Sequence, residues 1–131
     1  MGLDNGINVI RTIETSKIKV LQEFEESWDD EHKYDFHVCY WRKCWGLRND
    51  ILYLIGKQWD QLTDEYKFKL TINDIDNIIK LLKSYNAKTW ENSIWSWHEH
   101  KTHNKKHIKN LKKLKKLMKK HSIEVYFYDS Y

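Results

Sequence analysis

The sequence predicts an α+β fold, in which helices pack on one face of a small, mainly antiparallel sheet. Two patterns lead to this prediction. Short segments alternate with the period of two that is typical of strands, and others carry apolar stripes at the spacing of amphipathic helices. These segments do not repeat as strand–helix units, so a doubly wound parallel sheet is not expected. The length of 131 residues fits one domain, and we expect residues 1–131 to form it.

The first half of the chain predicts two strands and a helix. Residues 2–13 begin with turn-forming residues and then alternate, which predicts a strand. Residues 16–31 are acidic and irregular, and either a short helix or a loop fits them. Residues 34–41 alternate most clearly and predict a strand with one face on the core. Over residues 47–62 the apolar spacing becomes that of a helix.

The second half begins with a short strand at residues 68–70, followed by a helix that runs to about Tyr85. Thr71 and Asp74 mark the start of this helix, because they stand at the spacing of a capping box. Residues 123–128 alternate again and predict a closing strand after a basic C-terminal helix.

Residues 89–120 carry two helical stripes, and a single helix of about 30 residues would be about 45 Å long. A globule of this size is only about 36 Å across. The apolar stripe also lapses at Lys101 and Asn104. We therefore expect a break near residues 102–104, with Thr102 or Asn104 capping the second helix. A protruding basic helix is the alternative.

Aromatic residues are frequent in this chain, which has seven Trp, eight Tyr and four Phe. A hydrophobic content of 40% excludes intrinsic disorder, and a small core needs only part of these rings, because each buries about 150–250 Å². The surplus predicts exposed aromatic surface, so a homodimer is one expectation. No apolar run approaches the roughly 20 residues of a membrane span and no signal peptide is visible, so we expect a cytoplasmic protein without a membrane partner. Cys39 and Cys44 fit reduced thiols rather than a zinc site.

Four segments together resemble a family of small, uncharacterised proteins of tailed bacteriophages and prophages. They are MGLDNGI at residues 1–7, YWRKCWGLRN at residues 40–49, WENSIWSW at residues 90–97 and EVYFYDSY at residues 124–131. Members of this family begin with MGLD, carry a Tyr-Trp-Arg-Lys junction and end in an aromatic strand. The resemblance implies a phage protein in the cytoplasm of a bacterial host, with an accessory or counter-defence role such as sequestering a nucleotide signal of bacterial immunity. It implies no reaction.

Residues 40–49 gather aromatic and cationic side chains where the strand pattern becomes a helix pattern. Helix N-termini point N–H groups outward and hold anions, aromatic faces stack on bases, and guanidinium groups pair with phosphate. We expect two indoles to stack on a base and three cations to hold phosphate, while later aromatic residues form an opposing wall. The indoles are Trp41 and Trp45, the cations are Arg42, Lys43 and Arg48, the wall is Trp95, Trp97 and His98, and Tyr40 and Asn49 complete the set.

This pattern predicts a binding protein for a small anionic, nucleotide-like ligand, with no catalytic residue and no cofactor. The sequence contains no P-loop, dinucleotide fingerprint or nucleophile motif, and its acidic residues form no pair that can be placed across one cleft. The structural alternative is that Tyr40 and Trp45 only pack, while the cations form a solvated rim.

A histidine-rich stretch offers an enzymatic alternative. His100, His103 and His107 share one face of a helix, and three imidazoles so arranged could hold Zn²⁺ with one position open for water. The protein would then be a metal- or histidine-dependent phosphodiesterase or nuclease. The spacing is not that of HExxH, and polar surface histidines on a basic helix are the structural alternative.

Residues 100–121 contain ten lysines and no acid, so a total charge of +4 leaves −6 for the rest of the chain. The apolar residues of segment 105–120 fit one side of a helix, with lysines on the other sides. A nucleic-acid or host-protein binder acting through this face is the third functional interpretation. An ordinary amphipathic helix with solvated lysines is the structural one.

Overall fold

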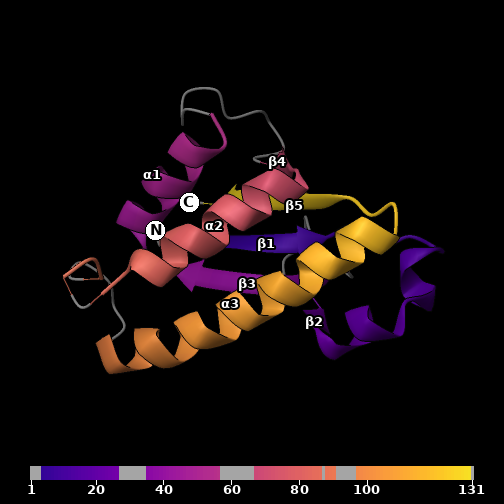
Figure 1. Cartoon of the computed structure of the whole chain (residues 1–131), viewed down its shortest axis with the longest axis horizontal. Helices are drawn as coiled ribbons and strands as arrows, with labels where there is room; N and C mark the ends of the chain where they lie inside the picture. The colour runs from indigo at the N-terminus through magenta and orange to yellow at the C-terminus, as the bar shows by residue number, and fades with distance from the viewer. Residues whose placement is uncertain (1–3, 27–34, 57–66, 87, 91–96, 131) are drawn as a thin grey trace.

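The computed structural model describes residues 4–26, 35–56, 67–86, 88–90 and 97–130 of the chain. The described strands form one sheet in the order β2-β3-β1-β5-β4, and every described pairing is antiparallel. The strands are β1 (Asp4–Val9), β2 (Glu25–Glu26), β3 (Phe36–Arg42), β4 (Lys67–Leu70) and β5 (Val125–Ser130). The helices α1 (Trp45–Leu54), α2 (Ile72–Ser84) and α3 (Trp97–Lys120) lie on one face of this sheet (Figure 1). The expected α+β fold with its closing C-terminal strand is confirmed.

β1 is the central strand, and one of its faces forms the core with the helices. Ile7 lies between Cys39 of β3 and Phe127 of β5, and all three are buried. On the other face, Gly6 leaves room for the ring of Tyr128. A Cβ atom at Gly6 would lie 2.4 Å from that ring and 2.5 Å from the carbonyl oxygen of Cys39. Because atoms cannot approach so closely, only glycine fits at this position of the central strand.

A bulge interrupts β3. The register between β1 and β3 shifts at Val38, which is an extra residue without a partner in β1. Strict alternation would place Phe36 and Cys39 on opposite faces of the sheet. Phe36 instead pairs with Val9 on the face that also carries Cys39, because one inserted residue inverts the alternation.

The acidic segment is helical in part. It contains two short 3₁₀ helices, η1 (Thr15–Lys17) and η2 (Lys19–Glu23), which precede the edge strand β2. Leu21 and Phe24 are buried and attach this segment to the core. The remainder, residues 27–31, lies outside the described part of the chain.

α1 is shorter than the helix predicted for residues 47–62. It ends at Leu54, and Gly56 follows with a φ of 71°. Glycine adopts this left-handed conformation at little cost, and it commonly stops a helix there. The N–H group of Gly56 bonds to the carbonyl oxygen of Tyr53 and closes the last turn. Residues 57–62 lie outside the described ranges.

α2 begins as predicted, and its capping box is confirmed. The Thr71 hydroxyl accepts a hydrogen bond from the N–H group of Asp74, whose carboxylate accepts one from the N–H group of Thr71. Its apolar side, with Ile75, Ile78 and Leu82, is buried in the core. The cap therefore fixes where the helix starts, and the apolar stripe fixes which side faces the sheet.

α3 is one continuous helix of 24 residues, so the predicted break near residues 102–104 is wrong (Figure 1). The described helix runs from Trp97 to Lys120 and is about 36 Å long. Asn104 does not cap a helix, because its amide donates to the carbonyl oxygen of Leu82 on α2 at 2.8 Å. Where the aliphatic stripe lapses, the inward positions are taken by the buried His100 and His107.

Candidate functional site

The chain turns sharply between β3 and α1, within the predicted site. Lys43 has a φ of 53°, and it is the only non-glycine residue in the described part of the chain with a positive φ. A left-handed lysine costs about 1–2 kcal/mol, so the surrounding fold holds this turn against a local penalty. The turn redirects the chain into α1, with Cys44 as its N-cap residue.

The N-terminus of α1 has no side-chain cap, although Ser, Thr, Asp or Asn is usual at this position. The thiol of Cys44 instead donates to the carbonyl oxygen of Arg42, and the distance from Sγ to this oxygen is 3.3 Å. Gly46, in the first turn, has open space where a Cβ atom would be. N–H groups at a helix start can bind an anion, and the missing side chain allows it to approach.

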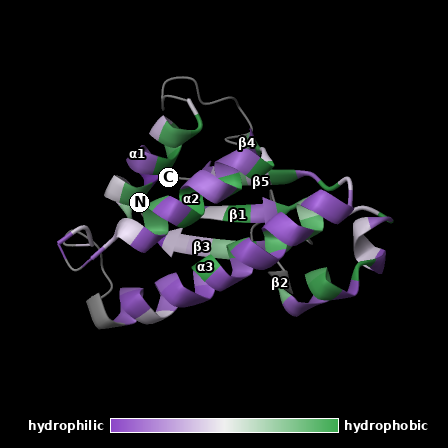
Figure 2. Ribbon diagram, viewed as in Figure 1, coloured by the Kyte–Doolittle hydropathy of each residue, from purple (hydrophilic) through white to green (hydrophobic). Residues whose placement is uncertain are grey.

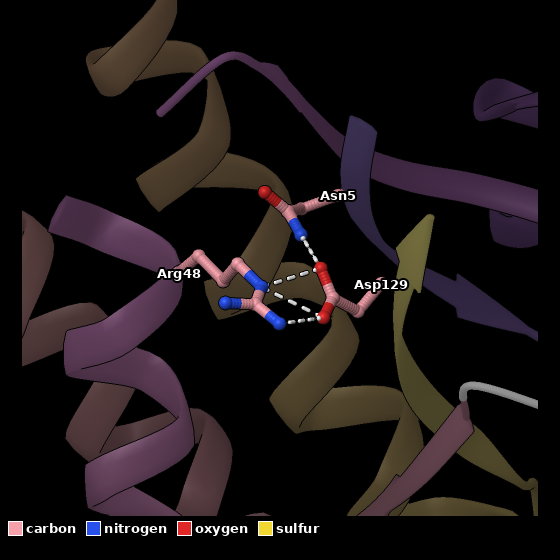
Figure 3. Close-up of polar contacts among 3 residues, drawn as sticks. All are labelled: Asn5, Arg48 and Asp129. Atoms are coloured by element: carbon pink, nitrogen blue, oxygen red, sulfur yellow. Dashed lines mark hydrogen bonds and ion pairs between the residues drawn. The ribbon is translucent and has the colours of Figure 1, made fainter. Parts of the chain in front are cut away.

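A buried ion pair ties α1 to the sheet (Figure 3). Arg48 Nε lies 2.8 and 2.7 Å from the two carboxylate oxygens of Asp129, and Nη2 lies 2.6 Å from Oδ2. Asn5 donates its side-chain amide to Oδ1 of the same carboxylate at 2.6 Å. The two charged side chains are 6% and 0% exposed. Arg48 is therefore engaged by β5, which corrects its expected role as a phosphate-binding residue.

Trp45 is the exposed aromatic residue of the junction. Trp45 is 47% exposed, and the centre of its ring lies 5.6 Å from Cζ of Arg48. The preceding Arg42 is exposed, and Lys43 is half-buried. We call Arg42, Lys43, Trp45 and Gly46 together the junction rim. The rim combines a stacking surface, two cations and an uncapped helix start.

Trp41 does not belong to this rim, contrary to its expected role in stacking on a base. It is 1% exposed, and its ring packs edge-on against His107 of α3, with ring centres 5.1 Å apart. Tyr40 points to the opposite face of the sheet, where its hydroxyl donates to Asp4 at 2.6 Å. Burial and the Asp4 carboxylate raise the pKa of Tyr40 to about 12. The two predicted indoles are therefore separated, one in the core and one at the surface.

The remaining predicted residues fall in different places. Asn49 is exposed on α1. Trp95 lies outside the described residues, and Trp97 and His98 form the start of α3, but their side chains are not among those described. The opposing wall that these three residues were expected to form stays a prediction.

The structure does not bring the three candidate zinc ligands together. His100 is buried in a stack on Trp90, with ring centres 4.0 Å apart. His107 packs on Trp41, and the centre of the His103 ring lies 6.4 Å from that of His107. Among the described residues, no three His, Cys, Asp or Glu side chains are placed to hold a metal ion. His100 and His107 instead fill the inner side of α3, whereas His103 is exposed.

These buried histidines predict that the protein loses stability in mild acid. Burial, and to a smaller extent the nearby His103 and Lys106, lower the pKa of His107 to about 3. Below about pH 6.5, His107 therefore binds a proton in the unfolded chain but not in the folded chain. The free energy of unfolding falls as the pH drops below that value. We expect a loss of about 2 kcal/mol from this residue between about pH 7.5 and pH 5, measured by urea unfolding.

The matched variants for this measurement are His107→Phe and His121→Phe. The first should reduce the pH dependence but not abolish it, because burial also lowers the pKa of His100, to about 4. The second should leave it unchanged, because His121 is exposed. Equal slopes in wild type and the His107 variant would show that other groups cause the acid sensitivity.

Sequence reasoning did not select Asn5 and Asp129. The available signals were weak: Asp129 is the single acid in a strand with three aromatic residues, and Arg48 stands three residues before the buried Ile51 on the inner side of α1. Each signal alone is equally consistent with a surface charge. Only the fold joins the two, since they are 81 positions apart.

No protein-family model matches the chain, and no curated protein or solved structure matches it significantly. Within the described ranges, no helix combines the length and the apolar character that crossing a membrane requires.

Proposed function

We propose that this protein binds and sequesters a small anionic ligand, a nucleotide-derived signal, at the junction rim. The observation that carries the proposal is an exposed indole, Trp45, set at a helix start that has no side-chain cap and is preceded by the exposed Arg42. The ligand class follows the resemblance of four sequence segments to phage proteins, for which sequestering an immune signal is a counter-defence role.

The energetics of the rim are adequate for such binding. One base stacked on Trp45 contributes about 1–3 kcal/mol, and each charged hydrogen bond to phosphate about 1.5–3 kcal/mol. One stack with two phosphate contacts therefore approaches the −8 kcal/mol or so of a micromolar complex. The ion pair of Arg48 with Asp129 also holds a cation against the Trp45 ring, which limits the ordering that a ligand would have to cause.

Calorimetric titration tests the proposal with cyclic di- and trinucleotides and ADP-ribose derivatives at low salt. We expect one class to bind the wild type, and Trp45→Ala to weaken its binding by about 10- to 100-fold through loss of the stack. Tyr53→Ala is the matched control, since Tyr53 is an aromatic residue of the same helix with 85% exposure. Absence of binding to every compound, or an equal loss in both variants, would refute the proposal.

Recovery of the ligand distinguishes sequestration from the enzymatic alternative. After long incubation with the protein, the ligand should be released intact on denaturation and identified by mass spectrometry. A hydrolysed product, made in proportion to the protein concentration, would instead indicate a phosphodiesterase. The same samples under native conditions report the number of subunits and test the expected homodimer.

A further inference from the structure

Lysines occupy one whole side of α3. With 3.6 residues per turn, six of them fall within an arc of about 80° and extend over about 27 Å of the helix. All six are exposed: Lys101, Lys105, Lys109, Lys112, Lys116 and Lys119. We call this row the lysine stripe. It is straight because α3 is unbroken, which the sequence alone did not predict.

Within the described ranges, the lysine stripe is not paired with acidic side chains. Two other lysines of α3 do reach the body: Lys113 pairs with Glu23 at 2.9 Å, and Lys115 pairs with Asp76 at 2.8 Å. Among the described residues, no member of the stripe makes a salt bridge or a side-chain hydrogen bond. Like charges four residues apart repel each other on a helix, so the stripe is unfavourable for the isolated protein.

The opposite side of α3 is committed to the core. Leu111, Leu114 and Leu117 are buried, so the helix has no apolar side to insert into a lipid surface. Figure 2 shows that the visible side of α3 is predominantly hydrophilic along its length. A partner for this surface must therefore be recognised by charge alone and must present negative charge along a line.

We propose that the lysine stripe binds the phosphate backbone of a nucleic-acid duplex without sequence preference. A duplex carries one negative charge per about 1.7 Å of its axis, which supplies a continuous line of phosphates for a row of this length. The stripe contains no aromatic residue to stack on unpaired bases and no carboxamide to read base edges. The two asparagines of α3 point inward, Asn104 to Leu82 and Asn110 to the carbonyl oxygen of Val38.

Fluorescence anisotropy with short DNA and RNA duplexes of unrelated sequence tests this proposal. If six lysines contact phosphates, log K should fall with log salt at a slope of about −5, which weakens binding by about 10³-fold between about 50 and 200 mM salt. Replacing three stripe residues, Lys105→Gln, Lys112→Gln and Lys116→Gln, should reduce the slope by about 3.

The matched control replaces three exposed lysines outside α3, Lys17→Gln, Lys19→Gln and Lys83→Gln, and has the same net charge. We expect its slope to equal that of the wild type. An equal reduction in both triple variants would overturn the proposal, because binding would then follow net charge rather than the stripe. Binding to anionic vesicles but not to duplexes, or tighter binding to single strands, would also overturn it.

The duplex and ligand proposals fail independently. The stripe variant should bind the small ligand at the junction rim with unchanged affinity, since none of its three lysines belongs to the rim. Circular dichroism and urea unfolding verify that both triple variants keep the wild-type fold.

Discussion

Replacing Asp129 with alanine is expected to destabilise the protein by about 3–5 kcal/mol. The substitution leaves the Arg48 guanidinium buried without its carboxylate, and it removes the acceptor for the Asn5 amide. A buried charge without a partner is costly because the protein interior solvates it poorly. The measurement is urea unfolding at neutral pH, compared with the wild type.

Two further variants test whether the cost of Asp129→Ala comes from leaving a buried charge without a partner, rather than from losing an ion pair of any kind. Arg48→Met combined with Asp129→Leu removes both charges and should recover most of the stability, except for the lost bond to Asn5. Lys113→Ala breaks the partly exposed pair with Glu23 and should cost no more than about 1 kcal/mol. A small effect of Asp129→Ala, similar to that of Lys113→Ala, would mean that water solvates Arg48.

This ion pair also links stability to the proposed function. It joins α1 to β5 and β1, and it fixes the helix whose N-terminus forms the junction rim. Because the buried Arg48–Asp129 ion pair already fixes the junction rim, little conformational entropy of the protein is lost when a ligand binds there. Loosening the pair should therefore weaken ligand binding even in protein that remains folded.

Local chemistry made several parts of the fold predictable. The α2 start follows from Thr71 and Asp74, which satisfy each other's N–H groups within one turn and need no distant partner. The closing strand β5 follows from the alternation of residues 123–128, in which Ile123, Val125 and Phe127 share one face. Gly56 also held a local signal for the end of α1, but the apolar stripe continuing to residue 62 suggested a longer helix.

Long-range contacts account for what the sequence did not predict. Asn104 is an ordinary helix cap in sequence terms, yet it bonds to Leu82 on another helix and leaves α3 unbroken. No glycine or other turn-forming residue next to Val38 predicts the bulge there. Asn5 and Asp129 are 124 positions apart, so only folding brings them together. Such contacts depend on the packed chain rather than on neighbouring residues.

The sequence did not predict how the residues of the candidate site divide between core and surface. Trp41 and Trp45 are four positions apart, and each has a cation close in sequence, Arg42 after Trp41 and Lys43 before Trp45. The bulge in β3 and the left-handed turn at Lys43 lie before and between them, and these two irregularities set the direction of each ring. Neither irregularity can be read from the alternation of polar and apolar residues.

Trp41→Ala should therefore mainly reduce the stability of the protein, whereas Trp45→Ala should mainly reduce its affinity for the ligand. Removing the buried Trp41 ring creates a cavity beside His107 and should cost about 3–5 kcal/mol in the free energy of unfolding. Removing the exposed Trp45 ring should change stability by less than about 1 kcal/mol, but it should weaken ligand binding. Urea unfolding gives the first quantity, and calorimetric titration gives the second.

Trp41→Phe keeps the test interpretable if the alanine variant does not fold, since it retains a ring and leaves a smaller cavity. It should be less destabilised than Trp41→Ala and should bind the ligand as tightly as the wild type. A Trp41→Phe variant that is as stable as the wild type but has lost ligand binding would contradict the core position of Trp41. The same result would restore the paired stacking of Trp41 and Trp45 that the sequence predicted.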